Sequence, residues 1–169
     1  MHVMIATDGT LDPERTTALA SRLAADGGRV SLLTVVEVPR RLLADMHAAA
    51  IEPDGKLSEV MTEYRTTQAE EPPTSRWIDD DSVVARYVAT KVNDATAQLA
   101  AALTEAGVAH EVIGEESEDA ASTILAAVDE RAVDILCIGT RGLGRFEGLL
   151  GSTSTKLARR ASCSVVLVR

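Results

Sequence analysis

The sequence predicts an α/β fold of three layers, α/β/α, in which helices cover both faces of a five-stranded, mostly parallel, doubly wound sheet. Short apolar runs alternate with segments of helical periodicity, and helices between consecutive strands imply right-handed crossovers and a parallel sheet. The apolar runs are nearly continuous, which is typical of strands covered on both faces. Although 46% of the residues are hydrophobic, only Trp77, Tyr64, Tyr87 and Phe146 are aromatic. Ala, Val and Leu must therefore form the core.

The N-terminal part of the chain predicts a strand, a helix and a second strand. Residues 3–7 are apolar and lead into a turn, Asp8-Gly9-Thr10. A helix is expected to begin after Asp12, whose carboxylate can cap it, with Pro13 in the first helical position. This helix is expected to end at Gly27-Gly28, and residues 29–36 form the second strand. The helix residues expected to face the core are Ala18, Leu19, Leu23 and Ala24.

Residues 37–81 differ in composition from the rest of the chain. They hold four of the five prolines and the acidic runs Glu70-Glu71 and Asp79-Asp80-Asp81, and no long apolar stripe runs through them. We therefore predict a single domain over residues 1–169, with a variable and mobile insertion at about 37–81 rather than a second domain.

The rest of the chain predicts three helices and three strands. Ser82 is expected to cap a long helix that ends at Gly107, and residues 108–113 form a strand that ends at Gly114. The last elements are expected to be a helix at about 119–132, a strand at 134–138, a glycine-rich loop, a short helix at about 152–161 and a strand at 164–168.

The charge distribution limits the classes of partner. The net charge of −9 argues against nucleic-acid binding, because phosphate contacts need Lys and Arg. Residues 137–169, however, carry six cations and one anion, which suggests a small anionic ligand. No apolar run approaches the ~18 residues of a membrane span, and no leader pattern precedes residue 2. With Cys137 and Cys163 read as reduced core residues, we expect a cytoplasmic protein that does not bind membranes.

The loop after the fourth strand carries the strongest functional signal. Ligands of doubly wound sheets bind beyond the carboxyl ends of the strands, where the strand order reverses. The loop begins at Gly139 and is rich in glycine, so its backbone amides can approach an anion closely. It then enters a helix at Gly151-Ser152-Thr153, where free N–H groups and the helix dipole favour a phosphate. Arg141 or Arg145 can add charge, and Ser152 can also serve as the helix N-cap.

Other known motifs fit the loop less well. A P-loop needs Lys and then Ser or Thr after its second glycine, whereas Arg145 and Phe146 follow here. A dinucleotide fingerprint needs an acidic residue downstream for the ribose, and none follows. The histidines lie on different predicted elements, and Ser152 has no evident general-base partner. We therefore expect no catalytic residues and no metal ligands.

Taken together, these motifs resemble the universal stress protein family. The resemblance rests on Gly-x-x-Gly at 139–142 followed by Gly-Ser at 151–152, between the fourth strand and the last helix. The turn at 8–10, Val-Val at 35–36, Gly-Glu at 114–115 and the hydrophobic closing strand also match. The resemblance covers residues 1–36 and 82–169, and the insertion matches in position only. It implies a Rossmann-like fold.

The resemblance implies that the ligand is ATP, alone or with Mg²⁺, with ADP and AMP as alternatives, and that the protein has a regulatory or stress-response role without efficient catalysis. Asp8 would hold the ribose or adenine side, the backbone at Val35 and Val36 would recognise adenine, and the glycine loop would hold the phosphates. The last strand, Ser164–Val168, would pair with its mate in a homodimer. The residues that would bind the nucleotide are Thr7, Asp8, Gly9, Val35, Val36, Gly139, Arg141, Gly142, Gly151, Ser152 and Thr153.

The chain departs from the family pattern at two places. Eight residues separate Gly142 from Gly151, one fewer than is usual, and Ser164 stands where the family usually has proline. Two alternatives therefore stay open. One is a dimeric interaction module that binds no nucleotide and recruits a partner through the acidic insertion. The other is a slow ATPase, which would need a base or a Mg²⁺ ligand near the γ-phosphate.

Overall fold

The computed structural model describes residues 1–25, 27–38, 80–140 and 151–168. By its internal packing the chain divides into two compact units, one formed by Met1–Glu37 with Val88–Arg169 and the other by Val38–Tyr87. The first unit contains the whole sheet. Of the second unit, the structure describes residue 38 and the first turns of one helix. A single domain with an insertion at 37–81 stays a prediction, because most of that segment lies outside the described residues.

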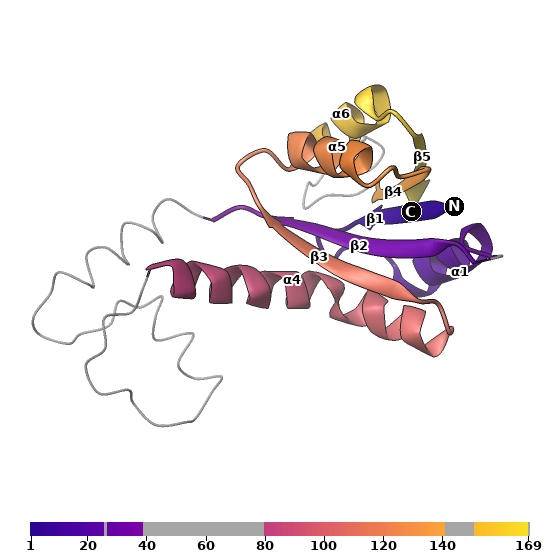
Figure 1. Ribbon diagram of the computed structural model, residues 1–169, viewed down its shortest axis with the longest axis horizontal. Coiled ribbons are helices and arrows are strands. Elements are labelled where there is room, and N and C mark those ends of the chain that lie inside the picture. Colours follow the sequence, from indigo (N-terminus) through magenta and orange to yellow (C-terminus); the bar gives the residue numbers. More distant parts are fainter. Residues whose placement is uncertain (26, 39–79, 141–150, 169) are drawn as a thin grey trace, which may run out of the picture. The chain divides into compact units, whose positions relative to one another are not determined.

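The first unit is built on a five-stranded sheet in which every pair of neighbouring strands is parallel (Figure 1). The strands are β1 (His2–Ala6), β2 (Arg29–Val36), β3 (His110–Glu116), β4 (Ile135–Gly139) and β5 (Ser164–Val168). Their spatial order is β3-β2-β1-β4-β5. The predicted α/β class and five strands are confirmed, and the sheet is wholly parallel. The order reverses between β1 and β4, which makes the carboxyl ends of these two strands the switch point of the fold.

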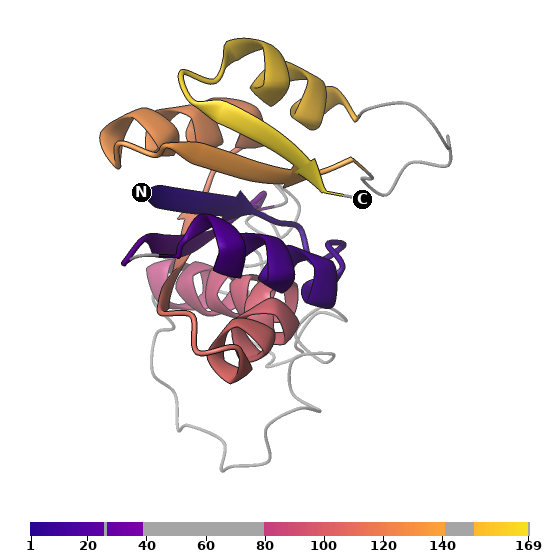
Figure 2. The same cartoon turned by 90° about the vertical axis from the view of Figure 1, so that its right-hand side faces the viewer.

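Helices cover both faces of the sheet, so the predicted three layers are confirmed (Figure 2). The described helices are α1 (Pro13–Leu23), α4 (Asp80–Glu105), α5 (Ala120–Glu130) and α6 (Ser152–Arg160). Alternate residues of β1 face opposite layers, as a strand requires. Val3 and Ile5 pack in one core cluster with Ala20 of α1 and with Leu99 and Leu103 of α4. On the other face, the cluster contains Met4, Leu33, Leu136, Ile124 and Val128 of α5, and Leu157 of α6.

Helix α1 begins as predicted, but it ends earlier and one of its predicted core residues is exposed. Asp12 is its N-cap and accepts a 2.8 Å hydrogen bond from the backbone N–H of Arg15, which confirms the capping prediction. The helix ends at Leu23, before the glycine pair. Leu19, Leu23 and Ala24 pack against the core as predicted. Ala18 is exposed, and Thr16 is buried instead. Thr16 is buried at low cost because its hydroxyl donates to the backbone oxygen of Asp12 at 2.6 Å.

Two further boundaries differ from the prediction. Helix α4 begins at Asp80, so Ser82 lies inside it and not at its cap. Acidic residues favour a helix N-terminus, and the run at 79–81 lets the helix start earlier. Strand β3 continues through Gly114 to Glu116. A Cβ at Gly114 would collide with Val92 of α4, so the glycine serves the approach of the helix to the strand and does not end the strand.

The amino edge of the sheet holds a buried polar network around His2. Its Nδ1 lies 3.1 Å from the carbonyl oxygen of Arg131, and its Nε2 lies 2.8 Å from Ser31 Oγ. Since a carbonyl can only accept, Nδ1 carries the proton, and in the neutral ring Nε2 accepts from Ser31. The backbone N–H of His2 donates to Asp134 Oδ2 at 2.6 Å. Ser31 is fully buried, so this Ser–His pair is closed to any substrate.

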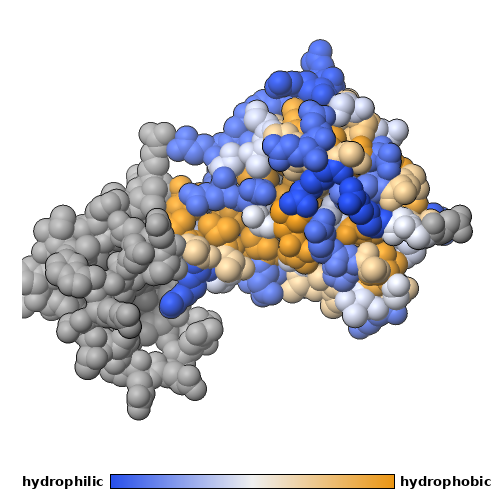
Figure 3. Space-filling model, in the orientation of Figure 1, coloured by the Kyte–Doolittle hydropathy of each residue, from blue (hydrophilic) through white to orange (hydrophobic). Residues whose placement is uncertain are grey.

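The two edges of the sheet differ in character. Strand β3 is mostly exposed and rich in glutamate, and Val112 is its exposed large hydrophobic residue. In the view of Figure 3, hydrophobic residues gather over the middle of the face, where β2 and β3 run. At the opposite edge, β5 pairs with β4 and exposes Leu167 by 43%. Within the described residues, no helix is both long enough and apolar enough to cross a membrane.

Candidate functional site

The turn that follows β1 lies at the switch point and is held by its neighbours. The backbone N–H of Thr7 donates to Leu33 of β2 at 2.9 Å, and the Thr34 hydroxyl donates to the Thr7 carbonyl at 3.1 Å. Gly9 has a φ of +89°, and a Cβ there would lie 3.2 Å from the Cα of Ala95 in α4. Only glycine suits both the positive φ and the close approach of the helix.

Asp8 presents a carboxylate at this turn. The side chain is exposed, and its Oδ1 accepts hydrogen bonds from the backbone N–H of Thr10 at 3.1 Å and from the Thr10 hydroxyl at 2.6 Å. Both bonds go to the same oxygen, which fixes the orientation of the carboxylate. A carboxylate held in this way can accept a further hydrogen bond through Oδ2, for example from a ribose hydroxyl.

Val35 and Val36, the last two residues of β2, direct their backbone groups to opposite sides of the strand. The carbonyl of Val36 accepts a 3.1 Å hydrogen bond from the backbone N–H of Ser117, so it faces β3. The carbonyl of Leu33 faces β1, because it accepts from Thr7. Backbone groups alternate in direction along a strand, so those of Val35 face the β1 side, beyond the residue at which β1 ends. Of the two valines, Val35 therefore directs its backbone groups to the side on which the turn after β1 lies, and Val36 directs its own to β3.

The end of β4 is tied to the start of α6 by a residue that the sequence reasoning missed. Ser154 Oγ donates to the carbonyl of Gly139 at 2.8 Å. Ser154 lies in a run of four hydroxyl residues, and no local pattern indicates which of them turns toward the strand. The N-cap of α6 is Gly151, and within the described part of the chain no side chain caps this helix. The prediction that Ser152 caps this helix is wrong, because Ser152 is already the first helical residue and is exposed.

The N-terminus of α6 differs from those of α1 and α5. Asp12 caps α1, and Asp119 caps α5 by accepting from the backbone N–H of Ala121 at 3.1 Å. At α6 a glycine takes the place of the aspartate, and the first turn contains no acidic residue. The first amides of a helix need acceptors, and the helix dipole favours an anion there. Among the three helices with a described N-cap, α6 is the one that lacks an acidic cap.

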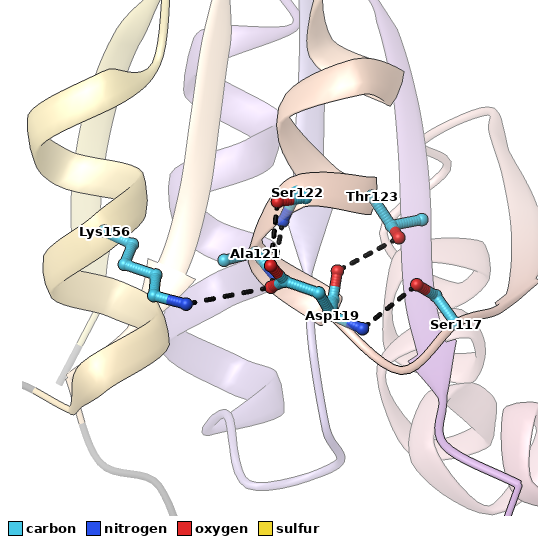
Figure 4. Close-up of polar contacts among 6 residues, drawn as sticks. All are labelled: Ser117, Asp119, Ala121, Ser122, Thr123 and Lys156. Atoms are coloured by element: carbon cyan, nitrogen blue, oxygen red, sulfur yellow. Dashed lines mark hydrogen bonds and ion pairs between the residues drawn. The ribbon is translucent and has the colours of Figure 1, made fainter.

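A cation lies close to this helix end. Lys156 of α6 reaches across to α5, with its Nζ 3.9 Å from Asp119 Oδ1 (Figure 4). The Ser122 hydroxyl donates to Asp119 Oδ2 at 2.8 Å. Hydrogen bonds from the hydroxyl and backbone of Ser122, with the charge of Lys156, lower the pKa of Asp119. The carboxylate therefore stays ionised and holds the lysine toward α5.

The comparisons with known proteins decide the family. The family model described as "Universal stress protein family" matches residues 1–169. The chain belongs to the universal stress protein family. No curated protein matches the sequence closely enough to count as a relative.

Solved structures of the family share the fold. A universal stress protein in complex with cAMP has a TM-score of 0.55 and 18% identity, with 100% of this chain and 96% of that chain covered. The protein from Archaeoglobus fulgidus in complex with dAMP has a TM-score of 0.51 and 16% identity, with coverage of 100% and 98%. A family protein from Arabidopsis thaliana with AMP bound has a TM-score of 0.51 and 18% identity, with coverage of 99% and 90%.

In this universal stress protein, the predicted ligand-binding residues that the structure describes lie at the carboxyl ends of the strands. Residues 7–9 follow β1, residues 35–36 end β2, and Gly139 ends β4, so three adjacent strands contribute. Gly151, Ser152 and Thr153 join them through the bond between α6 and β4. Arg141, Gly142 and Arg145 lie outside the described residues. Within the described part, no group of three His, Cys, Asp or Glu side chains could hold a metal ion.

Proposed function

We propose that this universal stress protein binds ATP at the carboxyl edge of its sheet, and that binding serves a regulatory or stress-response role without efficient catalysis. The observation that carries the proposal is the uncapped N-terminus of α6, held at the switch point by the bond from Ser154 to Gly139. Such a helix end offers backbone donors and a positive dipole end to a phosphate. The family complexes with cAMP, dAMP and AMP support an adenine nucleotide as the ligand.

Each part of the nucleotide has a matching group along this edge. The backbone of Val35 would bind adenine, and the carboxylate of Asp8, in the turn of Thr7 and Gly9, would accept from the ribose hydroxyls. The phosphates would lie between Gly139 and the first turn of α6, where the exposed hydroxyls of Ser152 and Thr153 can also donate. We also propose that Arg141 and Gly142 bind the phosphates.

The proposal extends to assembly and compartment. Strand β5 is an edge strand, and its exposed Leu167 favours pairing with a second copy in a homodimer. Cys137 and Cys163 are both free thiols, which fits the reducing cytoplasm.

The experiment that tests the proposal is calorimetric titration of the purified protein with ATP, ADP, AMP and adenosine, with and without Mg²⁺. Native mass spectrometry of the same sample identifies any nucleotide that purifies with the protein. The proposal predicts one adenine nucleotide per chain and weaker binding of ATP to the Asp8→Ala variant. Absence of binding at millimolar ATP would contradict it and favour the interaction module. ATP turnover that persists through purification and is lost in Asp8→Ala would instead indicate a slow ATPase.

A further inference from the structure

We infer that Ser154 is a positioning residue for the phosphates, because its hydroxyl holds the first turn of α6 against the end of β4. The inference rests on the proposed nucleotide site and concerns a residue outside its ligand set. Ser154 Oγ donates to the carbonyl of Gly139 at 2.8 Å, across fifteen positions of sequence. One hydrogen bond therefore joins the two ends of the glycine loop.

Burial separates the roles of the hydroxyl residues that begin α6. Ser152 and Thr153 are exposed, whereas Ser154 is half-buried. The hydroxyl of Ser154 is directed to the protein, and those of Ser152 and Thr153 are open to a ligand. The first intrahelical bond, from the Thr155 N–H to the Gly151 carbonyl, is 2.8 Å long. The backbone amides of residues 152–154 therefore have no acceptor within the helix, and they lie in the same turn that Ser154 holds.

Without the Ser154 hydroxyl, this turn depends on contacts further along the helix. Leu157 is the buried residue of α6 and packs in the core with Leu136 of β4, but it lies in the following turn. Helix ends fray, and donors that are ordered only on binding reduce the affinity for the ligand. Because a neutral hydrogen bond contributes about 1 kcal/mol, loss of the Ser154 bond should weaken phosphate binding by about fivefold.

The test compares Ser154→Ala with two other variants. Ser154→Thr keeps the hydroxyl and serves as the conservative variant. Ser21→Ala is the matched control, because Ser21 Oγ also donates to a backbone carbonyl, that of Thr17, at 2.8 Å within α1. ATP and adenosine affinities are measured by calorimetry, with competition for weak ligands. Amide hydrogen exchange of residues 152–155 is measured without nucleotide.

A positioning role predicts about a fivefold loss of ATP affinity in Ser154→Ala, with adenosine affinity unchanged within about twofold. Ser154→Thr and Ser21→Ala should bind both ligands as the wild type does. Amide hydrogen exchange at residues 152–155 should be faster than in the wild type in Ser154→Ala, and unchanged in the other two variants. Unchanged exchange overturns the inference, whether or not nucleotide binds, and so does a parallel loss of ATP and adenosine. A wild-type protein that binds neither ligand contradicts the proposed function instead.

Discussion

Replacing Gly151 with aspartate would give α6 the kind of cap that α1 and α5 already have. Gly151 has a φ of −58° and a ψ of 158°, a conformation open to any residue. Among the described residues, a Cβ at this position would meet Ser154 Oγ alone, at an ordinary contact distance of 3.9 Å. The new carboxylate can therefore accept from the first amides of α6, as Asp12 does from Arg15 at 2.8 Å. The fold should be retained while the proposed phosphate donors are occupied.

The expected effects on stability and on binding have opposite signs. An aspartate cap in place of glycine should stabilise the fold by a few tenths of a kcal/mol, with a similar gain from the helix dipole. ATP would lose charge-assisted hydrogen bonds of about 1.5–3 kcal/mol each. It would also meet a negative charge at close range, at a cost of about 1–4 kcal/mol. Together these losses should weaken ATP binding by at least about 100-fold.

The assay is calorimetric titration with ATP, together with thermal unfolding in the absence of nucleotide. The Gly151→Ala variant is the control, because it adds the Cβ without the carboxylate. It should keep ATP affinity within about threefold, since one methyl group meets only an ordinary contact here. If Gly151→Asp bound ATP as tightly as the wild type, the phosphate assignment would be refuted. A steep fall in melting temperature would instead refute the account of the helix cap.

Three further predictions concern the core, the thiols and the sheet edge. Gly114→Ala should lower the free energy of unfolding in urea by about 1–3 kcal/mol, because its Cβ meets Val92. The double variant with Val92→Ala should regain most of the lost free energy of unfolding. If the effects of the two substitutions on stability simply added, the contact would be contradicted. Burial raises the pKa of Cys137 to about 11, and burial also raises that of Cys163. Since thiolate is disfavoured in the folded state, stability should fall as the pH rises from about 9 toward 11. Cys137→Val should flatten this slope, measured by urea unfolding at each pH. Leu167→Asp should lower the molecular mass in light scattering from that of a dimer to that of a monomer, and an unchanged mass would exclude β5 as the interface.

The sequence was sufficient for the layers and strands, because apolar runs and helical periodicity are local patterns. It failed at Gly114, where the deciding contact is with Val92, in an element far away in the chain. Glycine ends many strands, and only the approach of α4 shows why it lies inside this one. Similarly, the apolar Ala18 is the expected core residue of α1, yet Thr16 is the buried one. Its burial is explained by the hydrogen bond from its hydroxyl to the backbone oxygen of Asp12, which the sequence pattern does not reveal.

The candidate site was predictable where the chemistry lies in the backbone. Glycines and hydroxyl residues before a short helix indicate an anion site from the sequence alone. The distinction between Val35 and Val36 depends on which strand each backbone group faces, and the role of Ser154 depends on where β4 ends. Neither the backbone direction of the valines nor the role of Ser154 can be predicted until it is known which strands are neighbours in the sheet.

The central position of β1 has a consequence for how the chain folds as it is synthesised. β1 starts at His2, yet one of its two partners is β4, and the backbone of His2 is bonded to Asp134. A chain emerging from the ribosome therefore carries its innermost strand with one edge unpaired until β4, at Ile135–Gly139, has been made. Exposed strand edges invite association with other chains. We therefore expect the nascent chain to be prone to aggregation until β4 emerges and pairs with β1.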